Sequence, residues 1–272
     1  MKRPIVVANW KMQLGLKEGE LLMDDILSRL EKIKKTAEKV DIIFCPPFFA
    51  LESVSKKLKG SFSLLNRKNQ MTNLFLGAQD CFWEHKGAFT GEISPDQLKE
   101  LGCQYVIIGH SERRQNLGET DEMVHHKIKT VLESELVPIL CVGETFEERQ
   151  NGAKDYVIIN QVTRALEGNV LKADQEIIIA YEPIWVIGSG QVVTQEEAQY
   201  TNQVIQQRMI DFYPLPLIKN NIRLLYGGGI DSTNVGQFIE KDIIDGILVG
   251  NASLKAEEFV KIIETIGLKS TQ

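Results

Sequence analysis

The sequence predicts a closed (β/α)8 barrel, because two patterns recur along its 272 residues. Eight short runs of apolar, mostly β-branched residues are each followed by a charged stretch whose apolar residues have helical spacing. The runs are apolar on both faces, which is typical of parallel strands buried on both sides. A barrel of eight such units needs about 250 residues. No linker rich in proline or serine interrupts them, so we expect one domain over residues 1–272.

The predicted strands are bounded by turn residues, and the helical stretch after each allows the right-handed crossover that parallel strands require. The strands are predicted at Ile5–Ala8, Ile42–Cys45, Leu74–Ala78, Tyr105–Ile108, Val137–Val142, Ile177–Tyr181, Ile222–Tyr226 and Ile247–Val249. The connection Lys59–Asn73 is polar and longer than this architecture usually needs, and we interpret it as a surface excursion.

Three helices are predicted from apolar stripes at helical spacing, and two helix starts from capping residues. Ser94-Pro95-Asp96 places proline at a first helical position, and Thr194 to Glu197 has the spacing of a capping box. The three stripes are Leu21, Leu22, Ile26, Leu30 and Ile33; Met123, Ile128, Val131 and Leu132; and Phe259, Ile262, Ile263 and Ile266.

Composition and charge exclude several classes of protein. The chain is 43% hydrophobic and has 31 basic and 37 acidic residues, which gives a net charge of −6. This charge argues against a protein that binds along a nucleic-acid backbone, but it is compatible with binding of a small anionic ligand. The four cysteines form no C-x-x-C pair, so neither a zinc site nor a disulfide framework is indicated. We find no apolar run of membrane-spanning length and no signal peptide, and we expect a cytoplasmic location.

Polar residues follow several predicted strands at the point where each ends. Asn9 and Lys11 follow the first strand, His110 the fourth and Glu182 the sixth. In a parallel barrel these ends meet at one rim, where chemistry takes place. Each residue alone has an ordinary interpretation: a solvated lysine, a loop histidine, or for Glu182 a buried carboxylate that needs a partner. Together they predict a site containing a cation, an imidazole and a carboxylate.

Glycine-rich turns follow the last three strands at Gly188–Gly190, Gly227–Gly229 and Gly250. Backbone N–H groups approach an anion closely where no side chain intervenes, and barrels often bind phosphate after strands seven and eight. Each glycine could instead serve only a tight turn. No P-loop or strand-linked G-x-G-x-x-G occurs, so a nucleotide is not expected. His125-His126 lacks a second ligand pair, and no metal site is predicted.

Seven segments in order, spread over nearly the whole chain, resemble the triosephosphate isomerase family, for which the (β/α)8 or TIM barrel is named. They are Ala8-Asn9-Trp10-Lys11-Met12, Gly87 to Ser94, Gly109-His110-Ser111-Glu112-Arg113-Arg114, Cys141-Val142-Gly143-Glu144, Ala180-Tyr181-Glu182-Pro183-Ile184-Trp185, Tyr226-Gly227-Gly228 and Leu248-Val249-Gly250.

The resemblance implies the interconversion of dihydroxyacetone phosphate and glyceraldehyde 3-phosphate through an enediolate, without a cofactor. By the same resemblance Glu182 is the base and His110 the neutral electrophile. Asn9 and Lys11 donate to substrate oxygens, and Glu112 supports Lys11.

The resemblance also implies a mobile lid from Pro183 to Val193 that excludes water from the enediolate. Its implied residues are Pro183, Ile184, Trp185, Val186, Ile187, Ser189 and Gly190, and the implied phosphate ligands are the backbone N–H groups of Gly188, Gly229, Gly250 and Asn251. The family is usually dimeric, and Lys86–Glu92, which contains Thr90, matches the loop that reaches the Asn9 and Lys11 region of the partner.

This chain departs from the family pattern at the lid and in one loop. The family usually has serine at the position of Gly229, glycine at Asn251 and Lys-Thr-Ala at Gln191-Val192-Val193. Backbone donors survive these changes, but a hydroxyl that helps hold the closed lid is lost. We therefore expect less favourable lid closure, with lower turnover or more methylglyoxal. The loop Lys59–Asn73 is longer than in the family.

Two alternatives remain open at this stage. A lyase could use Lys11 to form a Schiff base with a sugar phosphate, since barrels support many chemistries. A catalytically inactive phosphate-binding relative would be expected to have lost Glu182 or His110, and both are present.

Overall fold

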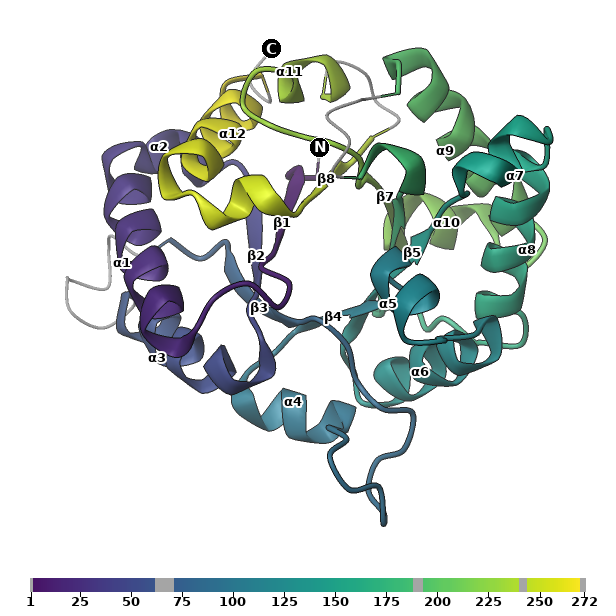
Figure 1. Ribbon diagram of the computed structural model, residues 1–272, viewed down its shortest axis with the longest axis horizontal. Helices are drawn as coiled ribbons and strands as arrows, with labels where there is room; N and C mark the ends of the chain where they lie inside the picture. The colour runs from purple at the N-terminus through teal and green to yellow at the C-terminus, as the bar shows by residue number, and fades with distance from the viewer. Residues whose placement is uncertain (1, 62–70, 188–192, 240–243, 270–272) are drawn as a thin grey trace.

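Eight parallel strands close into a barrel in the computed structural model, which describes residues 2–61, 71–187, 193–239 and 244–269. Each strand pairs with the next along the chain, and β1 (Ile5–Asn9) closes the sheet by pairing with β8 (Gly246–Val249). The helices form a ring around the strands (Figure 1). The predicted (β/α)8 fold is confirmed.

The predicted strand positions are confirmed with small changes at three ends. β1, β2 and β8 are each one residue longer than predicted, and the other five have the predicted bounds. The remaining strands are β2 (Asp41–Cys45), β3 (Leu74–Ala78), β4 (Tyr105–Ile108), β5 (Val137–Val142), β6 (Ile177–Tyr181) and β7 (Ile222–Tyr226).

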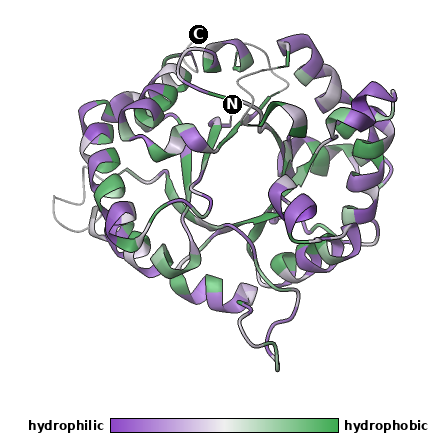
Figure 2. Cartoon of the chain, viewed as in Figure 1, coloured by the Kyte–Doolittle hydropathy of each residue, from purple (hydrophilic) through white to green (hydrophobic). Residues whose placement is uncertain are grey.

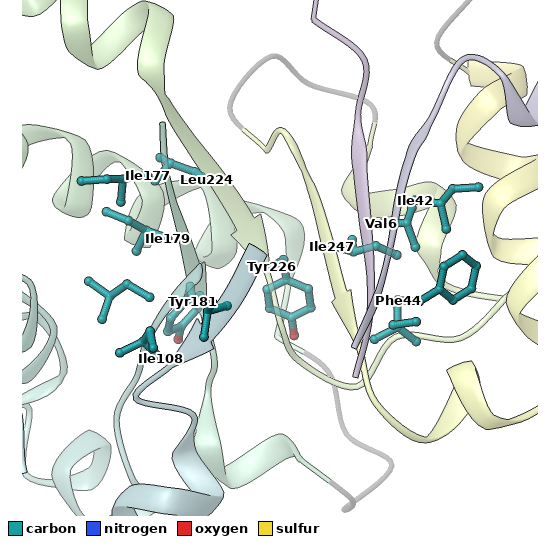
Figure 3. Close-up of a cluster of buried hydrophobic side chains, with 14 of the residues drawn as sticks. Val6, Ile42, Phe44, Ile108, Ile177, Ile179, Tyr181, Leu224, Tyr226 and Ile247 are labelled. Atoms are coloured by element: carbon teal, nitrogen blue, oxygen red, sulfur yellow. The ribbon is translucent and has the colours of Figure 1, made fainter. Parts of the chain in front are cut away.

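The strands are buried on both faces, as their unbroken apolar character predicts. One set of side chains, including Ile5, Ile107 and Ile178, forms a cluster built from strand residues alone. The alternate set packs against the helices, and Figure 3 shows part of it around Phe44 and Tyr226. Because successive side chains of a strand point to opposite faces, the first cluster fills the barrel and the second lies outside it. In Figure 2 the strands are accordingly hydrophobic and the outer faces of the helices hydrophilic.

The helices that surround the barrel vary from single turns to long amphipathic segments. None of the described helices is long and apolar enough to cross a membrane. They are α1 (Leu16–Lys32), α2 (Lys34–Ala37), α3 (Leu51–Ser61), α4 (Pro95–Leu101), α5 (Ser111–Asn116), α6 (Asp121–Glu133), α7 (Phe146–Gln150), α8 (Lys154–Leu166), α9 (Gln195–Met209), α10 (Leu215–Asn221), α11 (Val235–Phe238) and α12 (Ala256–Lys269), with short 3-10 turns at Phe48–Ala50, Ile184–Val186 and Asn251–Leu254.

Two of the predicted apolar stripes need correction. In α1 the buried face contains Met23, Ile26 and Leu30, whereas Leu21 is 69% exposed. Leu21 lies two residues before Met23, about half a helical turn away, and so points outward. In α6 Met123 was predicted to be part of the buried face, but it is only partly buried, and the next residue, Val124, is fully buried. The stripe predicted in α12 is confirmed, since all four of its residues are buried.

The helix starts follow the capping residues. Ser94 accepts from the N–H of Gln97, whose side chain accepts from the N–H of Ser94, and Pro95 opens α4. Thr194 accepts from the N–H of Glu197 at 3.2 Å. The predicted box at Thr194 is only half formed, because the Glu197 carboxylate pairs with the guanidinium of Arg149.

The structure describes both ends of the predicted surface loop Lys59–Asn73. Its first three residues belong to α3, residues 62–70 lie outside the described part of the chain, and Met71 and Asn73 are buried. The Asn73 amide donates to the carbonyl of Ala37 at 2.7 Å, which anchors the end of the loop just before β3. The first end is therefore helical rather than a loop, and the interpretation as a surface excursion was wrong at Met71 and Asn73.

Candidate active site

The structure brings the polar residues predicted at the strand ends to one rim of the barrel. Asn9 is the last residue of β1, His110 lies two residues after β4, and Glu182 directly follows β6. His110 Nε2 lies 3.1 Å from Glu182 Oε1. Lys11 reaches the same group, since its Nζ lies 2.6 Å from Oε1 of Glu112, two residues after His110.

Glu182 is a buried carboxylate that faces two hydrogen-bond donors from other residues. Only 2% of the residue is exposed. Oε1 faces His110 Nε2, and Oε2 accepts from the backbone N–H of Ser111 at 3.0 Å. These donors offset the free energy of removing a carboxylate from water. The Ser111 N–H contact was missed from the sequence, because a backbone donor leaves no mark on residue type.

The hydrogen bonds of His110 assign its ring proton to Nε2. His110 caps the N-terminus of α5, and its Nδ1 accepts from the N–H of Glu112 at 3.2 Å, so Nδ1 carries no proton. Gly109, with φ 73°, provides the sharp turn from β4 into this cap. His110 therefore presents one N–H donor, toward Glu182.

Lys11 adopts a left-handed backbone conformation, φ 53°, which costs energy for a residue with a side chain. Its N–H donates to Asn9 Oδ1 at 3.0 Å, and its carbonyl accepts from Gln79 Nε2 at 2.9 Å. Gln79 also donates to the carbonyl of Cys45 at 2.9 Å. Gln79 was not predicted, although it directly follows β3, and the same strand-end criterion would have found it.

The exit of β5 packs closely on the backbone of Glu182. A Cβ atom on Gly143 would lie 1.7 Å from the Glu182 carbonyl oxygen, so only glycine fits there. The Glu182 N–H donates to the carbonyl of Val142 at 2.7 Å. This packing extends the pairing of β5 with β6 one residue beyond the strands.

Glu144 joins the β5 exit to the predicted lid. It is fully buried and accepts from Trp185 Nε1 at 2.9 Å and from the Tyr181 hydroxyl at 3.2 Å. Burial raises the pKa of Glu144, and its hydrogen bond from Trp185 partly opposes the rise. Of the predicted lid, Pro183 to Ile187 are described, whereas Gly188, Ser189, Gly190, Gln191 and Val192 lie outside the described residues.

The predicted phosphate ligands Gly229, Gly250 and Asn251 lie at the ends of two adjacent strands, β7 and β8. A Cβ atom on Gly250 would lie 3.0 Å from Lys11 Cε and 3.4 Å from its Nζ. The ammonium group is thus next to the bare backbone of Gly250. Gly188, the fourth predicted ligand, is outside the described residues.

The loop between β3 and α4, which contains Thr90, extends beyond the ring of helices (Figure 1). Thr90 is exposed, and 43% of the neighbouring Phe89 is exposed. Phe89 packs against Phe82 with ring centroids 4.6 Å apart. In the part of the chain that the structure describes, no group of three or more metal-ligating side chains is placed to hold a metal.

Comparisons with known proteins identify the family to which this chain belongs. The family model described as triosephosphate isomerase matches residues 4–266. A triosephosphate isomerase of Thermoanaerobacter sp. is 41% identical over 97% of this chain and 99% of its own length, and that of Dictyoglomus thermophilum is 42% identical over 97% and 100%. The crystal structure of triosephosphate isomerase from Bartonella henselae superposes with a TM-score of 0.78 at 32% identity, over 97% of this chain and 98% of that one. The chain belongs to the triosephosphate isomerase family.

Proposed function

We propose that this protein interconverts dihydroxyacetone phosphate and glyceraldehyde 3-phosphate through an enediolate, without a cofactor. One observation carries the proposal: a buried carboxylate, Glu182, lies 3.1 Å from Nε2 of His110, whose Nδ1 accepts from the N–H of Glu112. A base and a hydrogen-bond donor this close can act on adjacent atoms of one small substrate.

The reaction moves one proton between two adjacent carbons. Glu182 takes a proton from the carbon next to the carbonyl, and the C–H electron pair becomes a carbon–carbon double bond. The carbonyl π pair moves to oxygen, where the Nε2–H of His110 stabilises the developing charge. Glu182 then returns the proton to the other carbon, after a proton has moved between the two oxygens. The Nε2–H that now donates to Glu182 would donate to the substrate oxygen instead.

Lys11 and Asn9 supply further positive potential at the substrate oxygens. Lys11 Nζ lies 2.6 Å from Oε1 of Glu112 and forms an ion pair with it. A charged ammonium suits electrostatic stabilisation and cannot attack a carbonyl to form a Schiff base. This arrangement favours the isomerase over a lyase.

The phosphate group of the substrate would bind the N–H groups of Gly188, Gly229, Gly250 and Asn251, with Lys11 beside Gly250. The segment Pro183 to Val193 would close over it as a lid. Closure would exclude water and prevent the enediolate from eliminating phosphate. Trp185, bonded to the buried Glu144, would set one end of this movement.

A coupled assay on glyceraldehyde 3-phosphate, comparing the wild type with Glu182→Gln, tests the proposal. We expect wild-type activity and a loss of about 10²- to 10⁴-fold in kcat for Glu182→Gln, since the amide cannot accept the proton. Glu122→Gln, at an exposed position of α6, is the control and should retain activity. Wild-type protein without isomerase activity, or trapping of Lys11 by borohydride with substrate, would contradict it.

We further propose that the protein is a cytoplasmic homodimer and that residues 1–272 form one domain. The exposed loop around Thr90 supports the dimer, since the matching loop of the family inserts into the partner. Sedimentation at the concentration used for activity should give twice the chain mass. A fully active monomer would refute this proposal.

A further inference from the structure

Gln161 of α8 binds the backbone of one residue from both sides. Its Oε1 accepts from the N–H of Gly143 at 2.8 Å, and its Nε2 donates to the carbonyl of Gly143 at 3.1 Å. Such two-way bonding is what a neighbouring β-strand would provide. The pairing of β4 with β5 ends at Leu140, so Gln161 substitutes for a strand that has already turned away.

Gly143 in turn lies against the backbone of the catalytic base. A Cβ atom there would lie 1.7 Å from the Glu182 carbonyl oxygen, which means that the two backbones are in direct contact. On either side of this contact, Glu182 N–H donates to Val142 at 2.7 Å and Ile184 N–H donates to Glu144 at 3.1 Å. A shift of Gly143 therefore displaces Glu182.

We propose that Gln161 is a positioning residue for the reaction: it holds Gly143 so that the Glu182 carboxylate stays aligned with His110 Nε2 and the reacting carbon. The inference rests on the proposed function, in which Glu182 is the base. The two bonds from Gln161 to the Gly143 backbone are its route to the site. An error of about 1 Å in a catalytic group can cost about 100-fold in rate.

The first test is Gln161→Met, which retains the length of the side chain and removes both hydrogen bonds. We expect kcat to fall about 10- to 100-fold because the base is misaligned. KM should change by less than about 2-fold, because the variant leaves the phosphate-binding turns and Lys11 untouched.

Gln175→Met is a matched control. Gln175 also makes two bonds to backbone, donating to the carbonyl of Leu132 at 2.6 Å and accepting from the N–H of Lys172 at 3.1 Å. It precedes β6, at the opposite end of that strand from Glu182. This variant should lose a similar amount of thermal stability with kcat unchanged.

Gln161→Glu adds a second measurement, the pH dependence of kcat, which a merely structural role would not change. The carboxylate can accept from the Gly143 N–H but opposes the Gly143 carbonyl, whereas the protonated carboxyl both accepts and donates as the amide does. The ratio of kcat between Gln161→Glu and wild type should therefore rise as the pH falls from 8 to 5. The same ratio for Gln161→Met should not vary with pH.

Equal losses of kcat in Gln161→Met and Gln175→Met would overturn the inference, as would a wild-type kcat in Gln161→Met. The proposed function would still stand in both cases, because the wild-type protein is active. An inactive wild type would remove both. If Gln161→Met does not fold, the pH dependence of Gln161→Glu decides: a rising ratio supports the positioning role and a flat ratio overturns it.

Discussion

Single residues define the chemistry of this site through the atoms that they present. His110 presents Nε2–H because its Nδ1 is already occupied by the Glu112 N–H. Lys11 presents its ammonium beside Gly250 because its backbone is held at φ 53° by Asn9 and Gln79. In both cases a backbone hydrogen bond determines which functional group faces the rim.

A substitution at Gly229 tests how the missing serine hydroxyl affects closure of the lid. Gly229→Ser restores the residue that the family usually has, and we expect a higher kcat and less methylglyoxal, because the hydroxyl favours the closed lid. Both rates are measured on the same preparation, with Gly60→Ser in α3, where a side chain would meet nothing within 4 Å, as the control. No change in either rate would contradict the hypothesis.

Between elements, charged side chains join α6 to the exits of β3 and β4. Lys127 of α6 is only 3% exposed, and its Nζ lies 2.7 Å from Asp80, two residues after β3, and also binds Glu119. Arg113 of α5 pairs with the same two carboxylates, at 2.9 Å and 3.2 Å. Two cations and two carboxylates thus lie together where α5 and α6 meet the barrel.

Removal of Lys127 should destabilise the protein strongly. Lys127→Met leaves two buried carboxylates short of a cation, and we expect a loss of about 3–5 kcal/mol in the free energy of unfolding. Urea unfolding at fixed protein concentration measures it. Lys129→Met, at an exposed position of the same helix, should change the free energy of unfolding by less than about 0.5 kcal/mol. Similar values for both variants would show that the cluster contributes little.

Asp80 makes the stability depend on pH. Burial raises its pKa to about 6 from an ordinary value of 3.8, although Lys127 opposes the rise. The native state then binds this proton more firmly than the unfolded chain does, so the contribution of Asp80 to stability is lost as the pH rises from about 4 to 6. Asp80→Asn lacks this loss. Its free energy of unfolding relative to wild type should increase over that range, and a constant or decreasing difference would contradict the assignment.

At the scale of the whole molecule, barrel closure brings the chemistry together. β1 pairs with β8, which places Lys11 beside Gly250, 239 positions later in the chain (250 − 11). The loop around Thr90 lies outside this closed unit and is free to contact a second copy (Figure 1).

A charge at this loop should weaken the proposed dimer. Thr90→Arg introduces a cation where the partner would cover the loop, and we expect the chain mass in sedimentation at low micromolar concentration, with a reduced kcat. Val170→Arg, at a position 80% exposed, makes the same change of charge elsewhere and should leave both unaltered. A stable Thr90→Arg dimer with full activity would count against the loop as the interface.

Much of the fold and part of the candidate site could be predicted from local patterns. Runs apolar on both faces located the strands to within one residue, because burial on both sides leaves a strong signal in composition. Helix faces were harder: Leu21 looks like a core residue and is exposed, and Lys127 looks like a surface residue and is buried. Leu21 is exposed because of its position around the helix, and Lys127 is buried beside Asp80, which comes from a distant segment of the chain.

Residue types and their spacing determine the order of the strands and the rim on which Asn9, Lys11, His110 and Glu182 lie. The tertiary structure alone decided which nitrogen of His110 faces Glu182, which backbone group donates to Glu182, and that Gln161 holds Gly143. Side-chain periodicity is a local property and can be read directly from the amino-acid sequence. Hydrogen bonds between a side chain and a distant backbone group depend on coordinates that only closure of the barrel creates.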